Sequence, residues 1–153
     1  MVTGRLQLLI LSAVLAATAS ASGQSSDAKI RVDGAWARRA PMMESSDAKA
    51  GSGNSAVYAT LVNPRNEPDA LISAATDVAE AVEIHESYQE SGMMMMRPVK
   101  KIDIPAGRKV EMKPGGYHIM LLNLKRDLKP KEVVSLTLMF EKAGKIPVNA
   151  PVR

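Results

Sequence analysis

The sequence contains no cysteine, only two histidines, and five aromatic residues counting one tryptophan, three tyrosines and one phenylalanine. The absence of cysteine excludes disulfides, thiolate metal sites and thiol catalysis. So few aromatic side chains cannot form the stacking platform that single-stranded nucleic acids require. The formal charge of +4 is scattered along the chain rather than gathered in one segment. We therefore expect no nucleic-acid partner.

No apolar run is long enough to span a bilayer, which takes about 20 residues. The longest candidate, Leu6 to Ala17, follows the single basic residue Arg5 and precedes the small-residue pattern Ala19-Ser20-Ala21. This order is typical of a cleaved secretory signal. We predict a signal peptide over residues 1–21, with no stable membrane insertion after its cleavage. No cysteine follows the apolar run, which argues against lipid attachment there.

The remaining chain has the pattern of one all-β domain. Residues 22–29 are small and polar, and we expect a disordered segment there, followed by a single domain over residues 30–153. Short apolar or alternating runs between Gly, Pro and Asn turns predict an antiparallel β-sandwich or barrel of Greek-key type. The predicted strands are 30–36, 55–62, 70–75, 79–87, 93–99, 109–112, 117–124, 133–141 and 145–152.

The sequence also predicts features of two connecting segments and of three large side chains. Residues 41–54 are rich in Gly and Ser and predict a long exposed loop. A helical turn is compatible with residues 125–131. Trp36, in the first predicted strand, is expected to anchor the core, as are Met112 and Met139.

The two histidines each lie near a methionine at spacings that suit a β-sheet. His118 and Met120 are two residues apart, so in a strand their side chains share one face. His85 and Met96 flank a turn, and if the hairpin is symmetric about Glu90-Ser91 they are directly opposed. Directly opposed residues have Cβ atoms about 4.5–5.5 Å apart, close enough to share an ion. Two local rules thus predict two His/Met pairs.

Imidazole and thioether together form a soft, neutral ligand set, which suits Cu(I) far better than Mg²⁺, Ca²⁺ or Mn²⁺. Without an anionic ligand the metal can leave for a tighter site, which favours transfer over storage. The absence of cysteine argues against a blue-copper electron carrier, whose centre is His₂Cys. Met94 shares a face with Met96 and is a reserve ligand, whereas Met93 and Met95 point the other way and suit core packing.

Three segments carry a resemblance to a known family: Val82 to Glu86, Met94 to Pro98, and Lys113 to Leu121. Together they are similar to the periplasmic PCu(A)C copper chaperones, whose motif is H-x10-M-x21-H-x-M. The resemblance implies a cupredoxin-like β-sandwich in the periplasm. It further implies a Cu(I) site whose ligands are His85, Met96, His118 and Met120.

The resemblance also implies a destination for the metal. Copper would go toward the Cu(A) centre of cytochrome c oxidase, either to the apo Cu(A) subunit or together with a Sco-type thiol copper protein. Two departures from the family pattern are visible. Glu86 stands where some members have methionine, and the segment 41–54 is longer than usual. Whether Cu(II) also binds is left open by the sequence.

Other functions compete with that of a copper carrier. A copper-sequestering or tolerance protein would use the same ligands but retain the metal. A metal-free, Ig-like adhesion or assembly module would tolerate loss of both histidines. An enzyme is disfavoured, because neither histidine lies in a nucleophile setting. A hydrolytic zinc site would normally require three nitrogen or oxygen ligands plus water.

Overall fold

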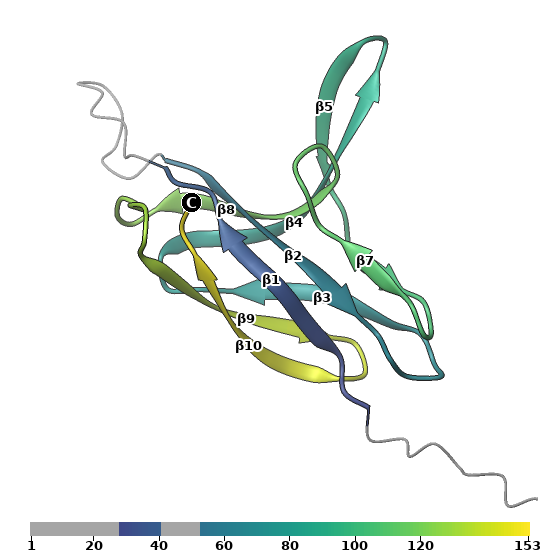
Figure 1. Cartoon of the computed structure of the whole chain (residues 1–153). Coiled ribbons are helices and arrows are strands. Elements are labelled where there is room, and N and C mark those ends of the chain that lie inside the picture. Colours follow the sequence, from purple (N-terminus) through teal and green to yellow (C-terminus); the bar gives the residue numbers. More distant parts are fainter. Residues whose placement is uncertain (1–27, 41–52) are drawn as a thin grey trace, which may run out of the picture.

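The structure is a computed structural model that describes residues 28–40 and 53–153. Within these ranges the chain forms strands joined by turns, and helices are absent from the described residues. Figure 1 shows the arrangement. The strands are β1 (Arg31–Ala37), β2 (Ser55–Val62), β3 (Asp69–Ala75), β4 (Ala79–Glu90), β5 (Met93–Pro98), β6 (Ile102–Ile104), β7 (Lys109–Glu111), β8 (Tyr117–Leu124), β9 (Val133–Phe140) and β10 (Gly144–Pro151).

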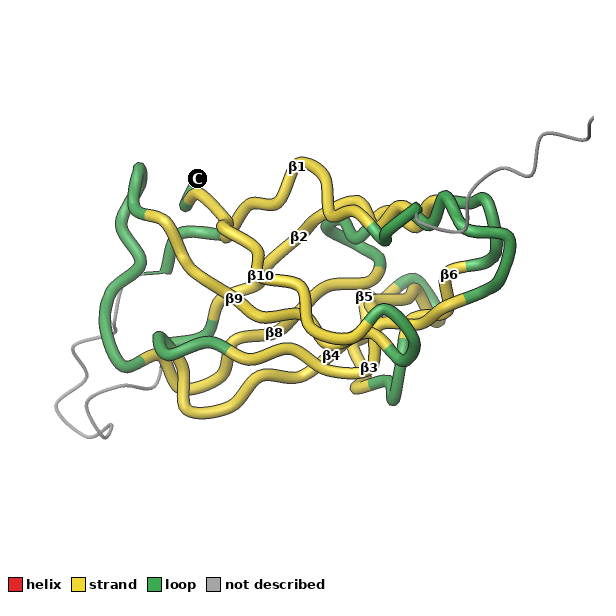
Figure 2. Tube along the Cα trace, turned by 90° about the horizontal axis from the view of Figure 1, so that it is seen from below, coloured by secondary structure: helices red, strands yellow, loops and turns green. Residues whose placement is uncertain are grey.

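The strands form two antiparallel sheets, and Figure 2 shows the strands of both sheets from below. The six-stranded sheet has the order β1-β2-β8-β4-β5, with β7 also paired to β2, and the four-stranded sheet has the order β10-β9-β3-β6. A parallel bridge between Ala37 and Val152 joins β1 to the end of the chain. The predicted all-β sandwich is therefore confirmed.

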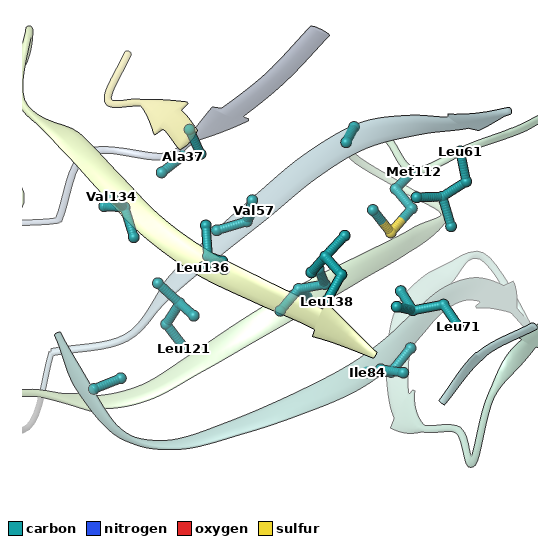
Figure 3. Packing of buried hydrophobic residues seen from close by; sticks show 14 of the residues in the cluster. Ala37, Val57, Leu61, Leu71, Ile84, Met112, Leu121, Val134, Leu136 and Leu138 are labelled. Atoms are coloured by element: carbon teal, nitrogen blue, oxygen red, sulfur yellow. The ribbon is translucent and has the colours of Figure 1, made fainter. Parts of the chain in front are cut away.

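The core lies between the two sheets and draws its buried residues from most of the strands. Figure 3 shows Val57, Leu61 and Leu121 of the six-stranded sheet facing Leu136 and Leu138 of the other. In β9 the pattern of buried and exposed residues alternates along the whole strand, as a half-buried strand requires. Fully burying one such side chain contributes about 1.5–3 kcal/mol.

All nine predicted strands are present, most of them with small differences at their ends. β6 is missing from the predictions because its three residues are too short a run to show alternation. The helical turn considered for residues 125–131 is wrong, since these residues form bends, a bridge and a turn. Residues 1–21 lie outside the described residues, as do most of 22–29 and 41–54. No helix among the described residues is long and apolar enough to cross a membrane.

Trp36 is not a core anchor, because a β-bulge in β1 changes the face on which it lies. The register passes from Asp33 opposite Thr60 to Trp36 opposite Tyr58, so β1 has one extra residue, accommodated near Gly34 at φ +62°. Trp36 therefore shares the outer face with Tyr58 and is half-buried. Met112 is in the core as predicted, but Met139 is only half-buried, and Met93 and Met95 are exposed rather than packed in the core.

The β4–β5 hairpin projects from the sandwich, and its register differs from the predicted one (Figure 1). His85 lies opposite Pro98, and Met96 lies opposite Ser87. The predicted direct opposition of His85 and Met96 is therefore wrong. The two-residue turn is Ser91-Gly92 rather than Glu90-Ser91, with φ values of 50° and 80°. Hairpin turns of this kind need positive φ at both central residues, which glycine supplies at the second position.

Candidate metal centre

The candidate residues lie on the outer face of the six-stranded sheet. Ile84 in β4 and Ile119 in β8 belong to the buried core. Because successive side chains of a strand point to opposite faces, their neighbours His85, His118 and Met120 face away from the core. The hairpin register places Met96 on the same face as His85. All four residues predicted from the sequence thus share one face across three adjacent strands.

The two histidines form a direct cross-strand pair. His85 of β4 lies opposite His118 of β8, and the centroids of their rings are 5.7 Å apart at an interplanar angle of 63°. Metal–imidazole bonds are about 2 Å long, as zinc sites show, so two rings on one ion have centroids within roughly 6–7 Å of each other. The observed separation therefore suits two imidazoles that share one ion. Sequence reasoning did not predict this pairing.

His118 is held by a backbone carbonyl. Its side chain is buried, and Nδ1 lies 3.1 Å from the carbonyl oxygen of Gly116. A carbonyl can only accept, so Nδ1 donates, and in the neutral ring Nε2 keeps a free lone pair. Burial lowers the pKa of His118 below its ordinary value, the Gly116 carbonyl partly offsets this, and nearby His85 lowers it again. The ring is therefore held in the neutral form that a metal requires.

A tight turn presents that carbonyl. Gly116 N donates to Lys113 O at 3.0 Å, and Gly115 between them has φ +84°. With Pro114 before it, this is the arrangement of a type II turn, which favours glycine at the position of positive φ. The Gly116 carbonyl also accepts from Ser87 N at 3.0 Å. The same oxygen thus ties the turn to β4 and fixes His118.

His85 is held by a carboxylate instead. Its Nε2 lies 2.7 Å from Oε2 of Glu83, two residues earlier in β4. The other ring nitrogen, Nδ1, is buried and has no hydrogen-bond partner among the described residues. Strand alternation places Glu83 on the same face as His85, and sequence reasoning gave it no role. The strand spacing of two residues was the signal that could have identified it.

The two methionines lie beside the histidine pair rather than opposite His85. Met96 is two cross-strand pairs nearer the hairpin tip, opposite Ser87, and 52% of it is exposed. Met120 lies opposite Glu83 and is partly buried. Diagonal neighbours across a sheet remain within reach of long side chains, so both thioethers can approach the His85–His118 pair.

The opposite face of the hairpin carries a separate ion pair. Glu86 lies opposite Arg97 and accepts from its Nη2 at 2.8 Å, and Arg97 also lies 4.9 Å from the ring centroid of Tyr88. Glu86 is therefore turned away from the histidines, as strand alternation predicts.

An aromatic row continues the site across the sheet. The ring centroid of Tyr58 in β2 is 6.1 Å from that of His118 and 4.6 Å from that of Trp36. Sequence reasoning missed Tyr58, because its place beside His118 depends on the pairing of β2 with β8. Rings packed on one side of His118 restrict its orientation.

The side chains on this face offer soft donor atoms. Across the described residues, no three side chains of the His, Cys, Asp or Glu types gather in a group that could hold a metal ion. A metal at this face would therefore depend on the thioethers in addition to the two imidazoles. That donor set suits Cu(I) rather than ions that prefer oxygen.

Comparison with known proteins agrees with the fold and with the family resemblance. Residues 30–152 match the family described as "Putative lipoprotein LpqE-like". The chain belongs to the LpqE-like family. A family relative, "Putative lipoprotein Lxx21020" of Leifsonia xyli subsp. xyli, is 31% identical over 140 residues, covering 91% of this chain and 78% of its own length.

Solved structures similar to this LpqE-like chain include PCuAC domains. The apo PCuAC domain from PmoF1 has a TM-score of 0.63 and 25% identity, covering 82% of this chain and 94% of that domain. The Cu(I) form of DR1885 from Deinococcus radiodurans has a TM-score of 0.57 and 30% identity, covering 80% of this chain and 78% of that protein. The predicted resemblance to the PCu(A)C family and the cupredoxin-like fold are thereby confirmed.

Proposed function

We propose that this chain is an exported, non-enzymatic copper chaperone. It binds one Cu(I) ion through His85, Met96, His118 and Met120. The observation that carries the proposal is the cross-strand pair of histidines. Each ring donates from one nitrogen to a neighbouring oxygen, which leaves its other nitrogen available. The Cu(I) form in which DR1885 was solved supports the choice of metal.

Transfer rather than storage is supported by the exposure of the site. Met96 lies on a projecting hairpin and is half exposed, so a ligand from an acceptor can reach the ion before the imidazoles release it. Neutral donors bind less tightly than thiolates bind soft metals, so an acceptor with cysteine ligands can take the ion. The acceptor that we propose is the apo Cu(A) subunit of cytochrome c oxidase, directly or through a Sco-type thiol protein. The predicted signal and the lipoprotein description of the family support a place in the periplasm.

The test has two stages. The purified protein is first titrated anaerobically with Cu(I) against a chromophoric chelator, in parallel with a His85→Ala/His118→Ala variant. We expect one tight equivalent for the wild type and its loss in the variant. No competition by the wild type would contradict the proposal and favour a metal-free module. The Cu(I)-loaded protein is then mixed with an apo Cu(A) domain, and retention of copper would indicate a sequestering protein.

A further inference from the structure

Glu83 is a charged side chain that contacts a candidate ligand, His85. Its Oε2 lies 2.7 Å from Nε2 of His85, and it is two residues away on the same face of β4. This distance is in the range of a charge-assisted hydrogen bond. The His85 side chain is only 13% exposed, whereas that of Glu83 is 47% exposed. The carboxylate thus reaches from solvent to the outer nitrogen of a largely buried ring.

The contact determines which nitrogen of His85 is free. An ionised carboxylate can only accept, so Nε2 must carry the proton, and in a neutral imidazole Nδ1 then holds the lone pair. Nδ1 is the buried atom without a hydrogen-bond partner among the described residues. A buried acceptor left unpaired costs free energy, and a metal ion would remove that cost.

We propose that Glu83 is a positioning residue for the copper ion. It holds His85 in the Nε2–H tautomer so that Nδ1 binds Cu(I), while His118 binds through Nε2. This inference rests on the proposed function. The two rings are then fixed by different partners, Glu83 for one and the Gly116 carbonyl for the other.

The charge of Glu83 also matters to the ion. Two imidazoles and two thioethers are neutral, so Cu(I) would leave a net charge of +1 at the site. Glu83 supplies one negative charge next to His85, and it lies opposite Met120 across the sheet. Acceptors that orient a ligating histidine also raise its basicity, and their loss typically costs about 10–100-fold in metal affinity.

Glu86 provides a matched control in the same strand. It lies on the other face of β4, and its carboxylate is already paired with Arg97 at 2.8 Å. Replacing Glu86 by glutamine changes the net charge of the protein as much as the same change at Glu83. It leaves the contacts of both histidines in place.

The experiment compares the wild type with Glu83→Gln, Glu83→Leu and Glu86→Gln. Long-range ¹⁵N–¹H correlation spectra of the copper-free proteins report the tautomer of each histidine, and anaerobic competition measures Cu(I) affinity. We expect the Nε2–H tautomer of His85 in the wild type and a mixture in Glu83→Leu, with affinity about 10–100-fold lower. In Glu83→Gln the amide oxygen still accepts, so the tautomer stays and the loss of affinity is smaller. Glu86→Gln should match the wild type in both measurements.

Each contrary result has a distinct meaning. An unchanged tautomer in Glu83→Leu would overturn the positioning role, whether or not affinity falls. A mixed tautomer with affinity within twofold of the wild type would overturn the link to copper. If the wild type itself fails to bind Cu(I), the proposed function fails and this inference falls with it. If the wild type binds Cu(I) and the Glu83 variants match it in tautomer and affinity, the proposed function stands and this inference fails alone.

Discussion

Replacing Met96 by leucine removes one sulfur from the candidate metal centre and changes little else. The neighbouring Met95 offers the same substitution on the opposite face of β5, where it lies opposite Tyr88. Both residues are substantially exposed, at 52% for Met96 and 41% for Met95. Comparing the two variants therefore distinguishes an effect of losing a sulfur on the histidine face from a general effect of replacing methionine by leucine.

The two variants should differ in affinity but not in stability. Surface substitutions usually change the free energy of unfolding by less than about 0.5 kcal/mol, and leucine and methionine have similar volumes. Removing a hydrogen-bond partner of a metal ligand typically lowers metal affinity by roughly tenfold or more. Removing a ligand itself should lower the affinity by at least as much. Each tenfold corresponds to about 1.4 kcal/mol of binding free energy. We expect at least a tenfold loss for Met96→Leu and less than twofold for Met95→Leu.

Anaerobic Cu(I) competition measures both affinities, and urea unfolding checks that stability is retained. Met94 shares the face of Met96, and its Cε reaches to 3.9 Å from where a Cβ on Gly115 would stand. Part of the affinity in Met96→Leu can therefore come from Met94, and Met94→Leu/Met96→Leu should lose that remainder. Equal affinities for Met96→Leu and Met95→Leu would refute the assignment of Met96.

Three other predictions follow from the same geometry. Burial lowers the pKa of His118, so the unfolded chain binds more protons than the folded one. The copper-free protein should lose stability as pH falls below about 6.5, and urea unfolding should show a smaller pH effect in His118→Gln. Gly115→Ala and Gly107→Ala each force alanine to positive φ and should cost about 1–2 kcal/mol. Only Gly115→Ala should also weaken Cu(I) binding, and equal affinities would contradict the role of the turn. Phe140→Ala should cost about 3–5 kcal/mol in thermal or urea unfolding, whereas the exposed Val133→Ala should cost under about 0.5 kcal/mol.

Local pattern was sufficient to predict most of the strands. Residues 117–124 match β8 end for end, because a strongly apolar run that follows a Pro-Gly-Gly turn is a clear local signal. It was not sufficient for Trp36, because one extra residue in a bulge moves every later side chain to the other face. The bulge itself depends on pairing with β2, which no local pattern reveals.

The shared face of the candidate residues was predicted correctly, but their arrangement across the strands was not. The faces of His85 and Met96 were right because a register error of two residues preserves the face of each side chain. Their direct opposition was wrong because the turn is centred one residue later. The pairing of His85 with His118 could not be derived locally, since it depends on β4 lying beside β8 in the sheet. Gly116 contributes through its backbone, which leaves no side-chain signal in the sequence.

X-ray absorption on the protein loaded with one equivalent of Cu(I) tests the central claim most directly. The account predicts a copper site with both nitrogen and sulfur neighbours. Because the chain has no cysteine, any protein sulfur must come from methionine. The sulfur contribution should fall in Met94→Leu/Met96→Leu and the nitrogen contribution in His85→Ala/His118→Ala. A spectrum without sulfur, or one unchanged by these substitutions, would contradict the His/Met copper site.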